Sequence, residues 1–131
     1  MPPNQSSEAA EPATILLVED ETLIRTVLAM DLEDAGYNIA EAGSADEALG
    51  ILQCSTDIGL VVTDVKMPGS MNGLELAAWV RQHMPSAKVV VMSGYVHEDV
   101  VETAATFDAF VKKPFKPADV TGLVEKLLST S

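Results

Sequence analysis

The chain has 131 residues, of which 47% are hydrophobic and 21% are charged, which is typical of one globular domain. Its formal net charge of −12 disfavours direct binding to the phosphate backbone of DNA or RNA. No apolar run approaches the roughly 18 residues of a membrane span, and no signal peptide is evident. The single cysteine, Cys54, forms no internal disulfide, so we expect a cytoplasmic location.

Short apolar runs alternate with helical patterns along most of the chain. Residues 1–13 contain three prolines among small and polar residues and predict a disordered tail, which leaves residues 14–129 as the folded domain. The apolar runs predict strands at residues 15–18, 37–42, 59–63, 88–92 and 109–111. Helical patterns predict helices near residues 24–35, 45–52, 72–84, 97–106 and 117–128.

Several local signals predict where helices begin and which side chains they bury. Ser44 with Glu47, and Asn72 with Glu75, match the capping-box pattern at two helix starts. The first helix is expected to end at Gly36. Its predicted packed face consists of Ile24, Val27, Leu28, Leu32 and Ala35.

Five successive strand–helix units predict the fold class. Parallel strands need long crossover connections, usually helices, so the pattern indicates a doubly wound (βα)5 α/β fold. We expect a five-stranded parallel sheet with helices on both faces. In such folds the ligand site lies outside the carboxyl ends of the strands.

Polar side chains follow four of the predicted strands. Glu19 and Asp20 follow the first, Asp64 the third, Ser93 the fourth and Lys113 the fifth. Three carboxylates at one sheet edge repel one another, and a divalent cation such as Mg²⁺ relieves that repulsion. A lysine and a hydroxyl supply hydrogen-bond donors for the oxygens of a phosphoryl group. Acids that merely cap helices would leave Ser93 and Lys113 without a role.

The chain resembles the response-regulator receiver domain of two-component and phosphorelay signalling from about Thr14 to Leu128. The segments that carry the resemblance are LVEDE at residues 17–21, DVKMP at 64–68 followed by NG at 72–73, SG at 93–94, and KPF at 113–115. The resemblance implies a flavodoxin-like strand order of 2-1-3-4-5. The loop at residues 68–73 is one residue longer than usual, a form that we associate with receivers of sensor kinases and with their stand-alone relatives.

The resemblance also implies a role for individual residues. Asp64 is the implied phosphoacceptor, assisted by bound Mg²⁺, with Mn²⁺ as an alternative. The implied metal ligands are Asp20 directly, Glu19 through water, Asp64, and the backbone carbonyl of Lys66.

Two further residues are implied to sense the phosphoryl group. Ser93 moves toward that group, while Lys113, joined to Pro114 by a cis peptide bond, pairs with its oxygens. Phe110 then rotates inward and changes the surface formed by the fourth helix, the fifth strand and the fifth helix, where a partner binds.

The predicted function is that of a phosphoacceptor, which is not an enzyme in the ordinary sense although it assists its own phosphorylation and dephosphorylation. A sensor histidine kinase or phosphotransfer protein is the expected donor, an unidentified protein is the downstream target, and the receiver is a monomer or weak dimer. A partner-binding pseudo-receiver and a receiver excised from a hybrid sensor kinase remain alternatives. A phosphatase of the haloacid-dehalogenase type is disfavoured because Lys66 stands where that chemistry needs a second acid.

Overall fold

The protein is a parallel sheet covered by helices, as seen in a computed structural model that describes residues 14–55, 57–94 and 106–129. The strands are β2 (Thr14–Val18), β3 (Asn38–Ala42), β4 (Ile58–Asp64), β5 (Lys88–Ser93) and β6 (Ala109–Lys112). The helices are α1 (Thr22–Asp34), α2 (Ala45–Cys54), α3 (Gly73–His83) and α5 (Pro117–Ser129). The predicted tail at 1–13 and nearly all of the predicted helix at 97–106 lie outside the described residues. No helix within those residues combines the length and the apolar character of a membrane span.

All five strands are parallel and lie in the order β3-β2-β4-β5-β6, which confirms the predicted order 2-1-3-4-5. Each predicted strand agrees with the observed one to within one residue at either end. The chain passes from β2 outward to β3 and then returns to β4 on the other side of β2. Ligands of doubly wound sheets bind at such a reversal, at the carboxyl ends of the two diverging strands.

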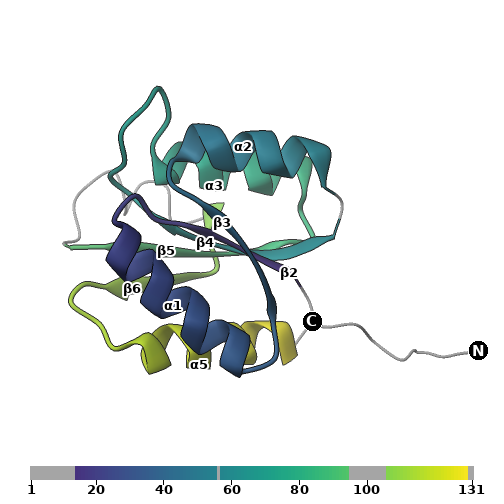
Figure 1. Cartoon of the computed structure of the whole chain (residues 1–131). Coiled ribbons are helices and arrows are strands. Elements are labelled where there is room, and N and C mark those ends of the chain that lie inside the picture. Colours follow the sequence, from purple (N-terminus) through teal and green to yellow (C-terminus); the bar gives the residue numbers. More distant parts are fainter. Residues whose placement is uncertain (1–13, 56, 95–105, 130–131) are drawn as a thin grey trace, which may run out of the picture.

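Helices cover both faces of the sheet, with α1 and α5 on one side and α2 and α3 on the other (Figure 1). Alternate side chains of β2 enter different cores: Leu16 and Val18 pack on the α2–α3 side, while Ile15 and Leu17 pack on the α1–α5 side. All four are fully buried. Burial on both faces explains why the strand is a continuous apolar run.

The two predicted capping boxes differ in the structure. At α3 the box is complete, because the Asn72 side chain accepts from the Glu75 amide and the Glu75 carboxylate accepts from the Asn72 amide. At α2 the Ser44 hydroxyl accepts from the Glu47 amide, but the Glu47 carboxylate accepts from the amide of Gly43, at 2.8 Å. The carboxylate half of the predicted capping box is therefore wrong, because Glu47 contacts the amide of Gly43 and not that of Ser44.

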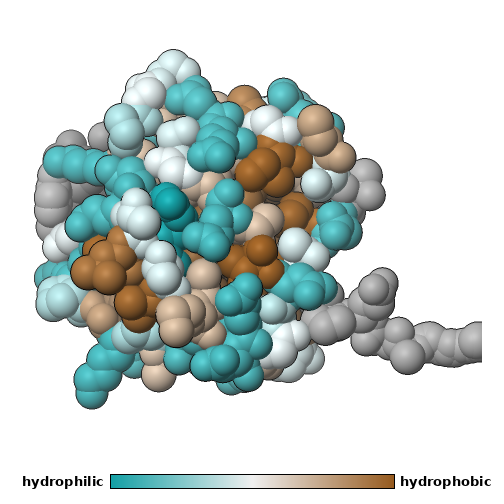
Figure 2. Space-filling model, viewed as in Figure 1, coloured by the Kyte–Doolittle hydropathy of each residue, from teal (hydrophilic) through white to brown (hydrophobic). Residues whose placement is uncertain are grey.

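Two side chains predicted to lie in the core are exposed, Val27 and Ala35, and Ala35 is the C-cap residue just beyond the end of α1. Helix α1 buries Leu28, Ala29 and Leu32, whereas Val27 remains 42% exposed. Each helical residue is rotated by roughly 100° from the last, so a face centred on Leu28 and Leu32 turns Val27 toward its edge. Val27 lies with Leu23 (77% exposed) and Met30 (59% exposed) on the solvent side, and these three residues form the α1 apolar patch. Figure 2 shows hydrophobic residues gathered over the N-terminal half of α1.

Candidate functional site

Three acidic side chains meet at the carboxyl edge of the sheet. Glu19 and Asp20 directly follow β2, and Asp64 is the last residue of the neighbouring strand β4. One carboxylate oxygen from each lies within 4.8 Å of the others. Glu19 is fully buried, Asp64 is 8% exposed, and Asp20 is exposed at the mouth of the site. An all-oxygen donor set that is open to solvent on one side fits a hard divalent cation such as Mg²⁺, which retains several waters.

Lys113, which follows β6, joins this acidic group. Its Nζ lies 2.9 Å from Asp64 Oδ2 and 3.2 Å from Glu19 Oε1. Burial raises the pKa of Glu19, and the Asp64 charge adds to this, while the Glu21 amide and Lys113 act in the opposite direction. Burial alone would lower the pKa of Lys113, but hydrogen bonding and attraction from Asp64 and Glu19 raise it above its ordinary value. A positive charge is therefore held beside the Asp64 carboxylate.

Backbone contacts fix the orientation of Asp64. The Val65 amide donates to Asp64 Oδ1 at 2.8 Å, so each oxygen of this carboxylate has a different donor. The Thr63 hydroxyl donates to the Asp64 carbonyl at 2.9 Å. A Cβ at Gly73 would overlap that same carbonyl, so α3 begins in direct contact with the end of β4.

The other predicted site residues lie around this centre. Ser93 ends β5, beside β4, is 5% exposed, and accepts from the Lys113 amide through its carbonyl at 2.7 Å. Phe110 is half-buried against the α2–α3 core, with its ring centroid 6.4 Å from that of Phe107. The bond between Lys113 and Pro114 is cis, as predicted. The roles of Ser93 and Phe110 in switching stay predictions.

A cleft beside the acids contains the remaining predicted ligand. Asp20 and the exposed residue Lys66 face the same cavity of about 510 Å³. Its other lining residues are Val65, Met67, Pro68, Asn72 and Leu74. The loop between β4 and α3 therefore forms one wall of the candidate metal site.

Sequence reasoning missed Arg25, which supports the acidic pair from α1. Its Nη1 donates to the Glu19 carbonyl at 2.7 Å, and its Nε pairs with Glu41 at 3.2 Å. The chain has only eight Lys and Arg residues, and Arg25 lies near a helix N-terminus, where the helix dipole disfavours a cation. A basic residue at this unfavourable position is the sequence signal that could have indicated a specific role for Arg25.

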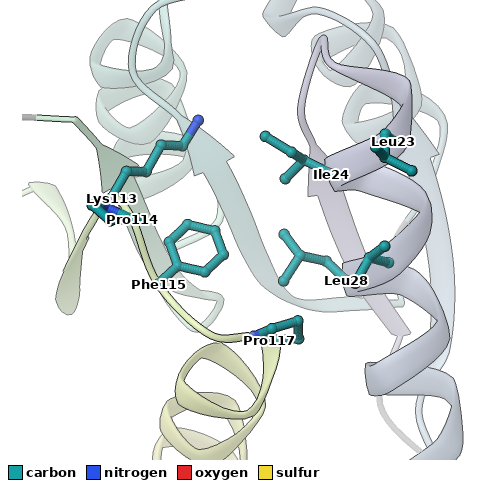
Figure 3. Close-up of a pocket in the computed structure, with 8 residues that line it drawn as sticks. Leu23, Ile24, Leu28, Lys113, Pro114, Phe115 and Pro117 are labelled. Carbon is teal, nitrogen blue, oxygen red and sulfur yellow. The ribbon is translucent and has the colours of Figure 1, made fainter.

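An apolar pocket of about 540 Å³ opens between α1 and the connection from β6 to α5 (Figure 3). Its lining residues are Leu23, Ile24, Val27, Leu28, Lys113, Pro114, Phe115 and Pro117. Figure 3 shows the Phe115 ring facing Ile24 and Leu28, with the Lys113 amine above the ring at the upper end of the view. Lys113 thus belongs both to the acidic site and to the rim of this pocket, and Leu23 and Val27 also belong to the α1 apolar patch.

Sequence comparison places this site among known proteins. Residues 15–125 match the family model of the response regulator receiver domain. The chain is 35% identical over 130 residues to the transcriptional regulatory protein PdtaR of Mycobacterium tuberculosis (strain H37Rv), covering 97% of this chain and 62% of PdtaR. It is 34% identical over 128 residues to the sensor kinase CckA of Brucella abortus (strain 2308), covering 95% of this chain and 13% of CckA. The chain therefore spans less than two thirds of each of these relatives.

Solved structures agree with this assignment. The response regulator TrrA of Thermotoga maritima, in complex with Mg(2+)-BeF, is 33% identical with a TM-score of 0.79, covering 88% of this chain and 98% of TrrA. A CheY-like receiver domain protein of Methanospirillum hungatei JF-1 is 28% identical with a TM-score of 0.84, covering 91% and 95%. The chain belongs to the response regulator receiver domain family, the phosphoacceptor domains of two-component signalling.

Proposed function

We propose that residues 14–129 act as a switch that accepts a phosphoryl group on Asp64, with Mg²⁺ held by Glu19, Asp20, Asp64 and the Lys66 carbonyl. The observation that carries the proposal is the position of the Asp64 carboxylate. It lies between the ammonium group of Lys113, at 2.9 Å, and the acidic pair at the end of β2. Phosphoryl transfer needs positioning and charge neutralisation, and these surroundings supply both.

Each contact has a task in the transfer. The donor's N–P bond breaks, its electron pair stays on the donor histidine, and an O–P bond forms to an Asp64 oxygen. The Val65 amide fixes the rotation of the carboxylate, and Lys113 neutralises charge on the phosphoryl oxygens. Mg²⁺ supplies further neutralisation when bound. Glu19 is fully buried, so little water screens its interaction with Lys113.

We place the docking site of the donor at the α1 apolar patch and the adjoining pocket. A phosphohistidine must reach Asp64, so the donor has to bind a surface next to the acidic edge. Lys113 borders both the site and the pocket, which supports this surface. The occupant is an apolar helix face of a histidine kinase or phosphotransfer protein.

The response to phosphorylation is proposed to run through Ser93 and Phe110. Ser93 hydrogen-bonds the phosphoryl group, Phe110 turns inward, and the surface around β6 and α5 then binds a downstream protein. The receiver works as a monomer or weak dimer. The burial of Ser93 beside Asp64's strand supports the first step, and the partial exposure of Phe110 supports the second.

Phosphorylation by acetyl phosphate, read by intact mass, tests the proposal. We expect one phosphoryl adduct that requires Mg²⁺ and is lost in Asp64→Ala. Asp57→Ala is the matched control, because Asp57 is an exposed acid just before β4, at the opposite edge of the sheet. Absence of an adduct on the unaltered protein would instead favour a pseudo-receiver that only binds partners.

A further inference from the structure

The loop between β4 and α3 is held by a carboxylate from another helix. Asp46, in the first turn of α2, accepts a hydrogen bond from the Ser70 amide at 2.9 Å and one from the Ser70 hydroxyl at 2.5 Å. The two residues are 24 positions apart in sequence. Two bonds to one residue fix both its position and its orientation, which a single bond would not do.

The backbone at Gly69 follows the same contact. Gly69 has a φ of +112°, a conformation that favours glycine. A Cβ at this position would overlap Asp46 Oδ2. The loop backbone therefore lies directly against the Asp46 carboxylate. This contact falls within residues 68–73, the loop that is one residue longer than usual.

The same loop forms a wall of the candidate metal site. Lys66, Met67 and Pro68 line the cleft that also contains Asp20. The loop is held by the Asp46–Ser70 contact and, two residues later, by the capping box at Asn72. Backbone torsions alone set the direction of a backbone carbonyl. A contact that fixes the loop backbone therefore also fixes the direction of the Lys66 carbonyl.

Stability alone gives a weak account of the Asp46–Ser70 contact. Asp46 is exposed, and water competes for hydrogen bonds at the surface. The hydroxyl and the amide of Ser70 lower the pKa of Asp46 below its ordinary value, so this carboxylate is ionised at neutral pH. A surface contact that fixes a ligand-bearing loop resembles the supporting interactions around protein metal sites.

We propose that Asp46 is a positioning residue for the metal site. Through Ser70 it holds the β4–α3 loop in the conformation that presents the Lys66 carbonyl to Mg²⁺. Asp46 touches neither the metal nor the phosphoryl group. The inference rests on the proposed function, because it takes the Lys66 carbonyl to be a ligand.

Isothermal titration of Mg²⁺ into the unphosphorylated protein tests this role. Asp46→Ala is expected to raise the Kd for Mg²⁺ roughly tenfold, the lower end of the range for supporting residues at metal sites. Ser70→Ala keeps the Asp46 charge and removes one of the two hydrogen bonds that Ser70 donates to Asp46, so it should raise the Kd by less. The double variant should bind no more weakly than Asp46→Ala, because both changes remove the same contact.

Asp57→Ala is the control for charge, since it also removes one exposed carboxylate that accepts from a hydroxyl, at 3.3 Å from Thr14. Its Kd should equal that of the unaltered protein. Phosphorylation by acetyl phosphate gives a second readout: saturating Mg²⁺ should restore the rate in Asp46→Ala but not in Asp64→Ala.

The outcomes separate the two proposals. Unchanged Mg²⁺ binding in both Asp46→Ala and Ser70→Ala overturns the positioning role and leaves the proposed function standing. A loss in Asp57→Ala equal to that in Asp46→Ala also overturns it, because the change in charge alone would then explain the effect. Failure of the unaltered protein to bind Mg²⁺ overturns the proposed function as well. Ser70→Ala leaves α2 intact, so the test survives if Asp46→Ala does not fold.

Discussion

Gly73 is the residue at which the start of α3 and the end of β4 come into direct contact. Its amide donates to the Val65 carbonyl at 2.9 Å, and a Cβ there would overlap the Asp64 carbonyl. A helix normally loses stability at a glycine, because an alanine restricts the unfolded chain more. At this position the absent side chain is instead what allows α3 to lie against the end of β4.

Alanine at Gly73 should therefore destabilise the protein. We expect Gly73→Ala to lower the free energy of unfolding by about 1–3 kcal/mol, as overpacking in a close contact does. Gly122→Ala in α5 is the matched control, because a Cβ there meets nothing within 4 Å; it should raise stability by about 0.5–1 kcal/mol. Urea denaturation of both variants measures this, and equal effects would show that the Gly73 contact is not tight.

Tyr37 gives a prediction about alkaline pH. Burial raises the pKa of its phenol, and the Glu125 carboxylate raises it further. The unfolded chain, with an ordinary tyrosine pKa of about 10, then releases the proton first as pH rises. The contribution of Tyr37 to the free energy of unfolding is complete below that pH and is lost as pH rises through the folded-state pKa.

Absorbance of the phenolate, as the difference between the unaltered protein and Tyr37→Phe, measures the folded-state pKa. Glu125→Gln should move that pKa toward its ordinary value. As pH rises above about 10, the free energy of unfolding should fall less in Tyr37→Phe than in the unaltered protein. A Tyr37 pKa at or below the ordinary value would contradict the burial seen here.

At the scale of elements, the sequence predicted which helices and strands exist better than what their side chains contact. The positions of β2, β4 and β5 followed from buried apolar runs, because burial on both faces leaves a continuous apolar pattern. The edge strands β3 and β6 are only partly buried. The exposure of Val27 could not be predicted, because it depends on how α1 is rotated against α5 and the sheet. The Asp46–Ser70 contact escaped prediction for a similar reason: it joins the first turn of α2 to the β4–α3 loop, and their approach is set by the packing of α2 beside α3.

Helix α1 carries a prediction about donor docking. Leu23→Asn should lower the rate of phosphotransfer from an autophosphorylated histidine kinase that phosphorylates the unaltered protein, by roughly tenfold, the effect of losing about 1.4 kcal/mol of binding free energy. Phosphorylation by acetyl phosphate should be unchanged, because this small donor needs no docking surface. Unfolding free energy should change by no more than about 0.5 kcal/mol, since Leu23 is 77% exposed.

Glu33→Gln, an exposed change farther along α1, serves as the control for this experiment. Normal transfer from the kinase to Leu23→Asn would place the donor on another surface. Equal losses with the kinase and with acetyl phosphate would instead mean that the substitution had disturbed the acidic site.

At the scale of the whole molecule, an acidic chain concentrates three carboxylates at one edge of its sheet. The sequence predicted this convergence because the topology of a doubly wound sheet brings the ends of its central strands together. It did not predict that Glu19 would be fully buried or that Lys113 would contact both Glu19 and Asp64. Those details depend on side-chain packing across β2, β4 and β6.

Mg²⁺ should consequently stabilise the entire fold. A ligand that binds only the folded state adds about 2.7 kcal/mol to the free energy of unfolding at one hundred times its Kd. We expect Mg²⁺ to raise Tm in proportion to this gain in the free energy of unfolding. Asp20→Asn should abolish most of the increase. Sodium chloride at the same ionic strength controls for screening of the net charge, and an equal rise with sodium would argue against a specific site.

The contact between Lys113 and Glu19 spans 94 residues, and that between Lys113 and Asp64 spans 49. The entropic cost of closing a loop grows with its length, so contacts of such long range are expected to form late in folding. During synthesis on the ribosome, Glu19 and Asp64 therefore emerge well before Lys113. We therefore expect a chain whose β6 has not yet docked to lack the cation that the proposed phosphoryl transfer requires.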